Sequence, residues 1–234
     1  MQENSWEKFH NAAREGRVDT LKEMLEKKEI DIDATNEAGM TGLMIACCCY
    51  RGNAIRFFIE NGANDELKNV HGMTAREILV QSDVPELGLE KIFDDAKRNR
   101  LTTAAQEGNL DAVKRMIKLG DDVNGVDMVG DFPLICASGN GHLEVVKHLA
   151  VNGAEIDKAN EYGMTPLMSA VCRFEEDCVS YLIEQGADEK RLNVHGRSAE
   201  TMARSNIVDV IKDAVKKRDN QKVMSLKRDN GFNR

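Results

Sequence analysis

The stretch EYGMTPLMSAVCRFEEDCVSYLIEQGADEKRLN, residues 161–193, contains the signals for two short helices and the turns that bound them. Thr165 precedes Pro166, and a hydroxyl at this place can cap a helix whose first turn tolerates proline. Apolar residues then recur at spacings of three and four from Leu167 onward, which gives the first helix one apolar face. A Val–Leu segment follows, and Gly then Ala at 186–187 closes the second helix. The stretch therefore predicts one helix–turn–helix unit.

Glycines return along the chain at the length of this unit. Within each of three series the step is 33 residues. The series are Gly39 and Gly72; Gly130, Gly163 and Gly196; and Gly120, Gly153 and Gly186. Self-similarity at a fixed period of this length indicates a repeat architecture, in which each unit buries its apolar face against its neighbours. We therefore expect Leu149 and Leu182, which lie 33 residues apart in second helices, to belong to the core.

The tetrapeptide NVHG occurs twice, at 69–72 and 193–196, and its flanks agree in kind. The two copies lie in LKNVHGMTAREI and RLNVHGRSAETM, 124 residues apart. Two further stretches, SWEKFHNAAREGRVDTLKEMLE and RLTTAAQEGNLDAVKRMIKLG, share the order Ala-Ala, polar residues, Gly and an amphipathic helix. These matches predict that a whole array was duplicated, each copy having a start unit and an NVHG closing unit.

The repeat pattern resembles that of the ankyrin-repeat family over nearly all of residues 5–215. Besides 161–193, the segments GDFPLICASGNGHLEVVKHLAVNGAEIDKAN (130–160) and GMTGLMIACCCYRGNAIRFFIENGANDELKN (39–69) carry it. The resemblance implies an all-α solenoid of stacked helix-turn-helix units with short β-hairpin loops. It also implies a non-catalytic protein whose partners meet the hairpin tips and the concave face formed by the first helices.

The chain departs from the family pattern at several positions. Tyr50 and Phe174 stand where the family has Gly between the two helices, and Phe132 stands in the place of the capping Thr. We therefore expect individual repeats to be less stable than idealised ones and the stack to hold through neighbour packing.

Three segments are predicted from these patterns. Module A, residues 5–96, has three units, of which the last is shortened. Module B, residues 97–220, has four units, and residues 221–234 form a basic, flexible tail. No hairpin fits between the modules, because the helix before residue 97 runs almost straight into the helix after it. Whether the modules stack continuously or bend at 94–101 is open.

Composition excludes several functional classes. The net charge is −8, and because residues 216–234 carry +5, the rest of the chain carries −13 and would repel a nucleic-acid backbone. No apolar run approaches the length of a membrane span, so we expect no membrane insertion. Six cysteines without pairing logic indicate a reducing compartment, the cytoplasm or the nucleus.

No motif predicts catalysis, a cofactor or a metal. The acidic stretch around Gly125 lacks the acid that a calcium loop needs at its first place. Cys47, Cys48 and Cys49 have no His or Cys at ligand spacing, and the tetrahedral sites of zinc need four converging ligands. We expect Cys47 to be buried and treat a redox-sensitive Cys48 or Cys49 as the weaker alternative.

The candidate site is therefore a binding surface for another protein. Its residues come from the hairpin tips and from the exposed sides of the first helices. They are Met40, Cys48, Cys49, His71, Met73, Met128, Val129, Asp131, Asn140, Tyr162, Met164, Arg173, His195 and Arg197. Exposed Met and Tyr at regular spacing suit adaptable contacts. In the alternative interpretation, each Met leans onto the neighbouring hairpin and stays intramolecular.

Two functions from different classes remain. The first is a monomeric, non-catalytic protein that binds another protein through these tips and the concave helix face. The second is a regulatory or inhibitory subunit of an enzyme, in which the acidic body covers a basic rim of the active site.

Overall fold

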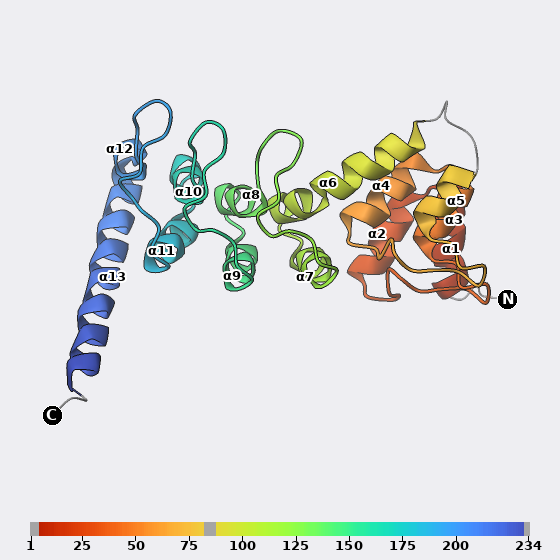
Figure 1. Cartoon of the computed structure of the whole chain (residues 1–234), viewed down its shortest axis with the longest axis horizontal. Helices are drawn as coiled ribbons and strands as arrows, with labels where there is room; N and C mark the ends of the chain where they lie inside the picture. Colours follow the sequence, from red (N-terminus) through yellow and green to blue (C-terminus); the bar gives the residue numbers. More distant parts are fainter. Residues whose placement is uncertain (1–4, 82–87, 232–234) are drawn as a thin grey trace. The chain divides into compact units, whose positions relative to one another are not determined.

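The computed structural model describes residues 5–81 and 88–231, and in these ranges the chain is helical between short hairpin loops (Figure 1). The helices are α1 (Ser5–Glu15), α2 (Val18–Glu26), α3 (Gly42–Cys48), α4 (Gly52–Glu60), α5 (Ala75–Gln81), α6 (Leu89–Glu107), α7 (Leu110–Lys118), α8 (Pro133–Gly139), α9 (Leu143–Val151), α10 (Pro166–Arg173), α11 (Glu176–Glu184), α12 (Ala199–Met202) and α13 (Ser205–Gly231). The predicted all-α repeat fold is confirmed.

The chain divides into two compact units, unit 1 (Met1–Leu101) and unit 2 (Thr102–Arg234). Helix α6 contributes residues to both. It is one continuous helix over the stretch where the sequence left no room for a hairpin. Helix α13 continues to Gly231, through most of the segment assigned to the tail. The limits of modules A and B and the flexibility of the tail stay predictions.

In unit 1 the first helices α1, α3 and α5 pack side by side, and α2 packs on α1 and α4. Buried alanines such as Ala12 and Ala46 allow these short helices to approach closely. Two of the largest core side chains come from helices α1 and α4: the rings of Phe9 and Phe58 meet edge to face, 5.7 Å between centroids. This is an aliphatic core around one aromatic cluster.

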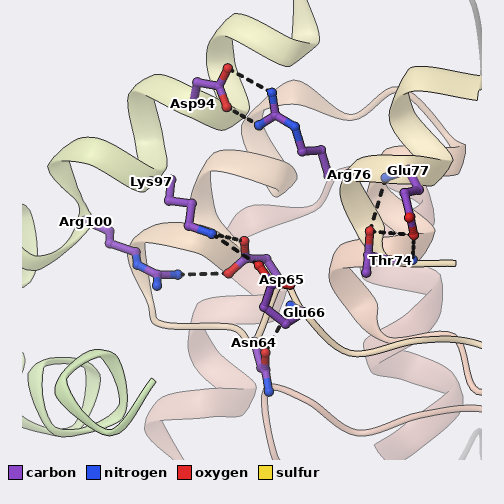
Figure 2. Close-up of polar contacts among 9 residues, drawn as sticks. All are labelled: Asn64, Asp65, Glu66, Thr74, Arg76, Glu77, Asp94, Lys97 and Arg100. Carbon is purple, nitrogen blue, oxygen red and sulfur yellow. Dashed lines mark hydrogen bonds and ion pairs between the residues drawn. The ribbon is translucent and has the colours of Figure 1, made fainter. Parts of the chain in front are cut away.

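Helix α6 is attached to the rest of unit 1 by ion pairs (Figure 2). Asp65, which is buried, accepts from Lys97 Nζ at 2.5 Å and from Arg100 Nη1 at 3.4 Å. At exposed positions, Arg76 of α5 forms a bidentate ion pair with Asp94 of α6. The charged residues of this part of α6 thus contact the hairpin base and α5.

Unit 2 repeats the same arrangement in two rows (Figure 1). Helices α8, α10 and α12 form one row, and α7, α9, α11 and α13 form the other. Met116, Leu149 and Leu182 lie 33 residues apart on successive second-row helices, and each is fully buried. The prediction that Leu149 and Leu182 belong to the core is confirmed. The period of the sequence is therefore the period of the packing.

An ion pair also joins helix α13 to the rest of unit 2. Arg218 of α13 donates to Glu189 at 2.9 Å, and both side chains are largely buried. Burial alone would raise the pKa of Glu189, but the hydrogen bond and charge of Arg218 outweigh it, so this pKa lies below its ordinary value. The pair occupies the same place as Asp65 and Arg100 in unit 1, because Asp65 and Glu189 each follow the Gly-Ala that ends a second helix.

The predicted helix cap at Thr165 is confirmed. Its side chain accepts from the backbone N–H of Met168 at 3.2 Å. Thr41 caps α3 in the same way through Met44. Phe132, at the equivalent place before α8, makes no side-chain cap bond, so α8 lacks this stabilisation of its N-terminus.

The turns between paired helices require a left-handed backbone. Gly141 has φ +73° there, and Tyr50 and Phe174 take φ +56° and +65° at the turns where the family has Gly. A side chain with a Cβ is strained in this conformation by about 1–2 kcal/mol. The two substitutions noted in the sequence therefore place backbone strain at a turn of each unit.

Replacing Phe174 with Gly is expected to stabilise unit 2 by about 0.5–1 kcal/mol, because the strain is removed and the Phe side chain is already half exposed. Urea unfolding measures the change. Gly141→Ala is the matched control at the preceding turn, where a Cβ would meet the Glu175 carboxylate, and it is expected to destabilise. A less stable Phe174→Gly variant would contradict the assignment of strain.

Candidate binding surface

Each hairpin tip is held by one Asn or Asp side chain. Its oxygen accepts from the backbone N–H groups two and four residues further along, as Asn160 does from Tyr162 and Met164 at 3.0 and 3.1 Å. The residues in this role are Asn36, Asn69, Asp127, Asn160 and Asn193. Such turns compete well with other backbone conformations and fix the loop.

Our interpretation of the sequence missed these five residues. The sequence does contain a signal for them. An Asn or Asp stands three residues before each tip glycine, as Asn160 does before Gly163; these glycines are Gly39, Gly72, Gly130, Gly163 and Gly196. They do not belong to the exposed surface. They determine its shape.

Neighbouring hairpins are also bonded to one another. In unit 2, Val194 N–H donates to the carbonyl of Tyr162 at 3.2 Å, and Asn160 Nδ2 donates to Asp131 Oδ1 at 2.8 Å. In unit 1, Val70 N–H donates to the carbonyl of Ala38 at 3.1 Å. The tips within each unit are therefore adjacent parts of one surface.

The tips of unit 2 expose large apolar side chains. Val129 is 73% exposed, Tyr162 and Val194 are each 63% exposed, and Met128 is 53% exposed. We call these four residues the tip ridge. They come from three consecutive hairpins, α7–α8, α9–α10 and α11–α12, which lie along one edge of unit 2 (Figure 1).

The other predicted tip methionines lie differently. Met40, Met73 and Met164 are half-buried, and Met40 and Met73 pack against the core of unit 1. Asn69 Nδ2 lies 3.4 Å from Met40 Sδ, and Asn193 lies similarly close to Met164. Met40 and Met164 thus make contacts with the neighbouring hairpin of the kind that our alternative interpretation describes, whereas Met73 packs on the core.

The predicted helix-side residues divide between the units. Cys48 is exposed and Cys49 half-buried in unit 1, where partial burial and the neighbouring Cys49 raise the pKa of Cys48. In unit 2, exposed Arg173 reaches half-buried Asn140, with Nη1 3.4 Å from Oδ1. A raised pKa disfavours the reactive thiolate, which gives no support to the weaker alternative of a redox-sensitive Cys48.

The remaining predicted residues are charged or ionisable. His71, His195 and Arg197 are exposed at their tips, and Asp131 is half-buried beneath Asn160. Unit 1 holds Met40, Cys48, Cys49, His71 and Met73, and unit 2 holds the other nine. In unit 2, consecutive tips bring together exposed apolar, aromatic and charged side chains.

The geometry defines a class: paired short helices at a 33-residue step, with hairpins bonded in series, form a helical-repeat solenoid. A family model described as "Ankyrin repeats (3 copies)" matches residues 9–87 and 95–218. The chain belongs to the ankyrin-repeat family. Ankyrin repeats are generally protein–protein interaction modules and typically non-catalytic.

Solved structures show the same fold at low sequence identity. The ankyrin repeat domain of Bcl-3, described as a unique member of the IkappaB protein family, is 24% identical with a TM-score of 0.50; the match covers 88% of this chain and 97% of that one. The human ASB11 ankyrin repeat domain is 21% identical with a TM-score of 0.50, and the match covers 88% of this chain and 96% of that one.

Two further observations concern the described residues only. In 5–81 and 88–231, no helix has the length and apolar character needed to cross a membrane. Within the same ranges, no three His, Cys, Asp or Glu side chains gather as metal ligands would.

Proposed function

We propose that this protein binds another protein, without catalysis, through its hairpin tips, with the tip ridge of unit 2 as the main contact. The observation that carries the proposal is the row of Met128, Val129, Tyr162 and Val194, all more than half exposed on consecutive tips. Large apolar side chains that lie mostly exposed in such a row are typical of an interaction surface.

The tips are also preorganised for binding. The side-chain bonds of Asp127, Asn160 and Asn193 fix each loop, and the Val194–Tyr162 backbone bond joins two of them. A loop that is already ordered loses little conformational entropy when a partner binds. Arg173 and Asn140, at the C-terminal ends of the first helices α10 and α8, supply further polar groups.

Replacing Met128 with Ser and Tyr162 with Ala together is expected to weaken partner binding about tenfold or more, because both side chains would be buried in the complex. The partner is first isolated with the intact chain, and the dissociation constant is then measured for each variant. The thermal unfolding midpoint should stay near that of the parent, since neither side chain belongs to the core.

Val151→Ser is the matched control, because Val151 is 78% exposed at the end of α9, away from the tips. It should leave binding unchanged. Equal weakening by the control, or unfolding of the tip variant at the temperature of a core variant, would contradict the proposal. Activity assays on the isolated partner then distinguish plain binding from the regulation of an enzyme.

A further inference from the structure

The α11–α12 hairpin carries a different charge from its counterpart in unit 1. Residues 190–197 read KRLNVHGR, and the counterpart 66–73 reads ELKNVHGM. The first segment has three Lys or Arg and no acidic residue, whereas the second has one Glu and one Lys. Asn193 and Asn69 hold the two tips with the same pair of backbone bonds. The two hairpins thus share a backbone conformation and differ in side-chain chemistry.

The positive charges of this hairpin point to solvent. Lys190, Arg191 and Arg197 are exposed, and none of the described residues forms an ion pair with Arg191 or Arg197. The neighbouring acid Glu189 is buried and is already paired with Arg218 at 2.9 Å. Asp188, the next acid, lies just before the segment and uses one oxygen to accept from the backbone N–H of Lys190. Residues 190–197 are therefore a local positive patch on a chain whose net charge is −8; exposed acids adjoin it in sequence at Glu200 and precede Tyr162 at Glu161.

Apolar surface adjoins this patch. Leu192 is 61% and Val194 is 63% exposed, and the Val194 backbone is bonded to that of Tyr162 on the preceding hairpin. A partner that covered these three side chains would bring its own neighbouring groups close to the cationic ones. This arrangement suits a partner segment in which carboxylates lie on both sides of an apolar side chain.

We propose that the α11–α12 hairpin, residues 190–197, docks an acidic segment of a partner protein that carries large apolar side chains between its carboxylates. The proposal rests on the proposed function and narrows its partner to one chemical class. Carboxylates pair with Arg191 and Arg197, and the apolar side chains cover Val194, Leu192 and Tyr162. Arg suits this role because its planar guanidinium can accept a carboxylate on two N–H groups at once.

The rest of the chain favours a protein segment over a nucleic acid. Outside residues 216–234 the charge is −13, which repels a long polyanion that extends beyond the hairpin. A short acidic segment engages only the hairpin. The exposed aliphatic side chains Leu192 and Val194 also add affinity for apolar side chains and none for a phosphate backbone.

Fluorescence anisotropy with defined probes tests the inference on the full chain. The probes are a short peptide of Glu, Asp, Leu and Phe, its twin with Gln and Asn in place of the acids, and its twin with Ser in place of Leu and Phe. A single-stranded DNA of similar charge is the fourth. The acidic apolar peptide should bind about tenfold more tightly than any of the other three, and its affinity should fall as salt is added.

Two charge-reversed variants locate the site. Arg191→Glu with Arg197→Glu should weaken binding of the acidic apolar peptide by about tenfold or more. Lys114→Glu with Lys118→Glu changes the net charge equally at exposed positions of α7 and should change the affinity by less than about twofold. Circular dichroism confirms that both variants fold.

Three results would overturn the inference: no binding of the acidic apolar peptide, equal weakening by the α7 pair, or DNA that binds as tightly as the peptide. Its failure is distinguishable from that of the proposed function. Binding of the natural partner could depend on Met128 and Tyr162 and yet be unaffected by charge reversal at Arg191 and Arg197. In that case the proposed function holds, and the inference of an acidic segment is wrong.

Discussion

Replacing Asp65 with Ala is expected to destabilise unit 1 by about 3 kcal/mol, because it removes a buried carboxylate that faces two cations. Asp65 is 7% exposed and the Arg100 side chain only 3% exposed, so water cannot replace the lost charge. The single tryptophan of the chain, Trp6, lies in unit 1, and its indole N–H donates to the carbonyl of Thr35 at 2.8 Å. Trp6 fluorescence during urea unfolding therefore reports on this unit.

An exposed ion pair of helix α6 provides the control. Asp94→Ala breaks the exposed pair with Arg76 and should cost less than about 1 kcal/mol. Asp65→Leu combined with Arg100→Met replaces the buried charges by apolar groups and should recover most of the loss. Equal costs for Asp65→Ala and Asp94→Ala would show that burial does not set the strength of these pairs.

Replacing Phe58 with Ala is expected to lower the stability of unit 1 by about 4 kcal/mol. Phe58 is fully buried, and its ring lies 5.7 Å from that of Phe9 and 5.8 Å from that of Phe57, measured between centroids. The truncation therefore removes apolar burial and both aromatic contacts, and it leaves a cavity between α1 and α4. Trp6 fluorescence again provides the measurement.

Gly42 makes this prediction more specific. A Cβ on Gly42 would lie 2.4 Å from Phe58 Cζ, so Gly42→Ala alone should destabilise unit 1. With Phe58 already truncated, the nearest remaining atom is Phe9 Cε1 at 3.2 Å, so the added methyl needs only a small shift of that ring. Alanine also favours the helix over glycine by about 1 kcal/mol. The double variant should then be more stable than Phe58→Ala alone. Additive losses would show that the ring does not occupy the space beside Gly42.

The repeat architecture could be predicted because its signals are local and recur. The 33-residue steps located the units, Thr165 before Pro166 marked the start of a helix, and the spacing of Leu149 and Leu182 marked the core. Each of these depends on the residue itself and on its near neighbours in sequence. The structure confirms the fold class, the cap and the buried leucines.

The exposure of the tips could not be predicted from residue type. Met128 and Met164 have the same side chain near equivalent tips, yet Met128 is more than half exposed and Met164 is half-buried. The two methionines occupy different places in their tips, one residue after Asp127 and four residues after Asn160, and Met164 also lies close to Asn193 of the next hairpin. That is a tertiary contact between residues 29 apart in sequence. For the same reason, Asp65 and Glu189 read as ordinary acidic residues until their partners on α6 and α13 are known.

The serial contacts of unit 2 also have a mechanical consequence. Each helix pair is connected to the next through its hairpin and its second-row helix, so a pull on α13 is transmitted through the repeats one after another. We expect helix α13 to detach first, because it is the terminal helix and is held by its packing on α11 and by the Arg218–Glu189 pair. Every repeat released after it adds 33 residues of chain, about 110 Å when extended. A partner bound across three tips would hold those repeats together and make unit 2 harder to extend.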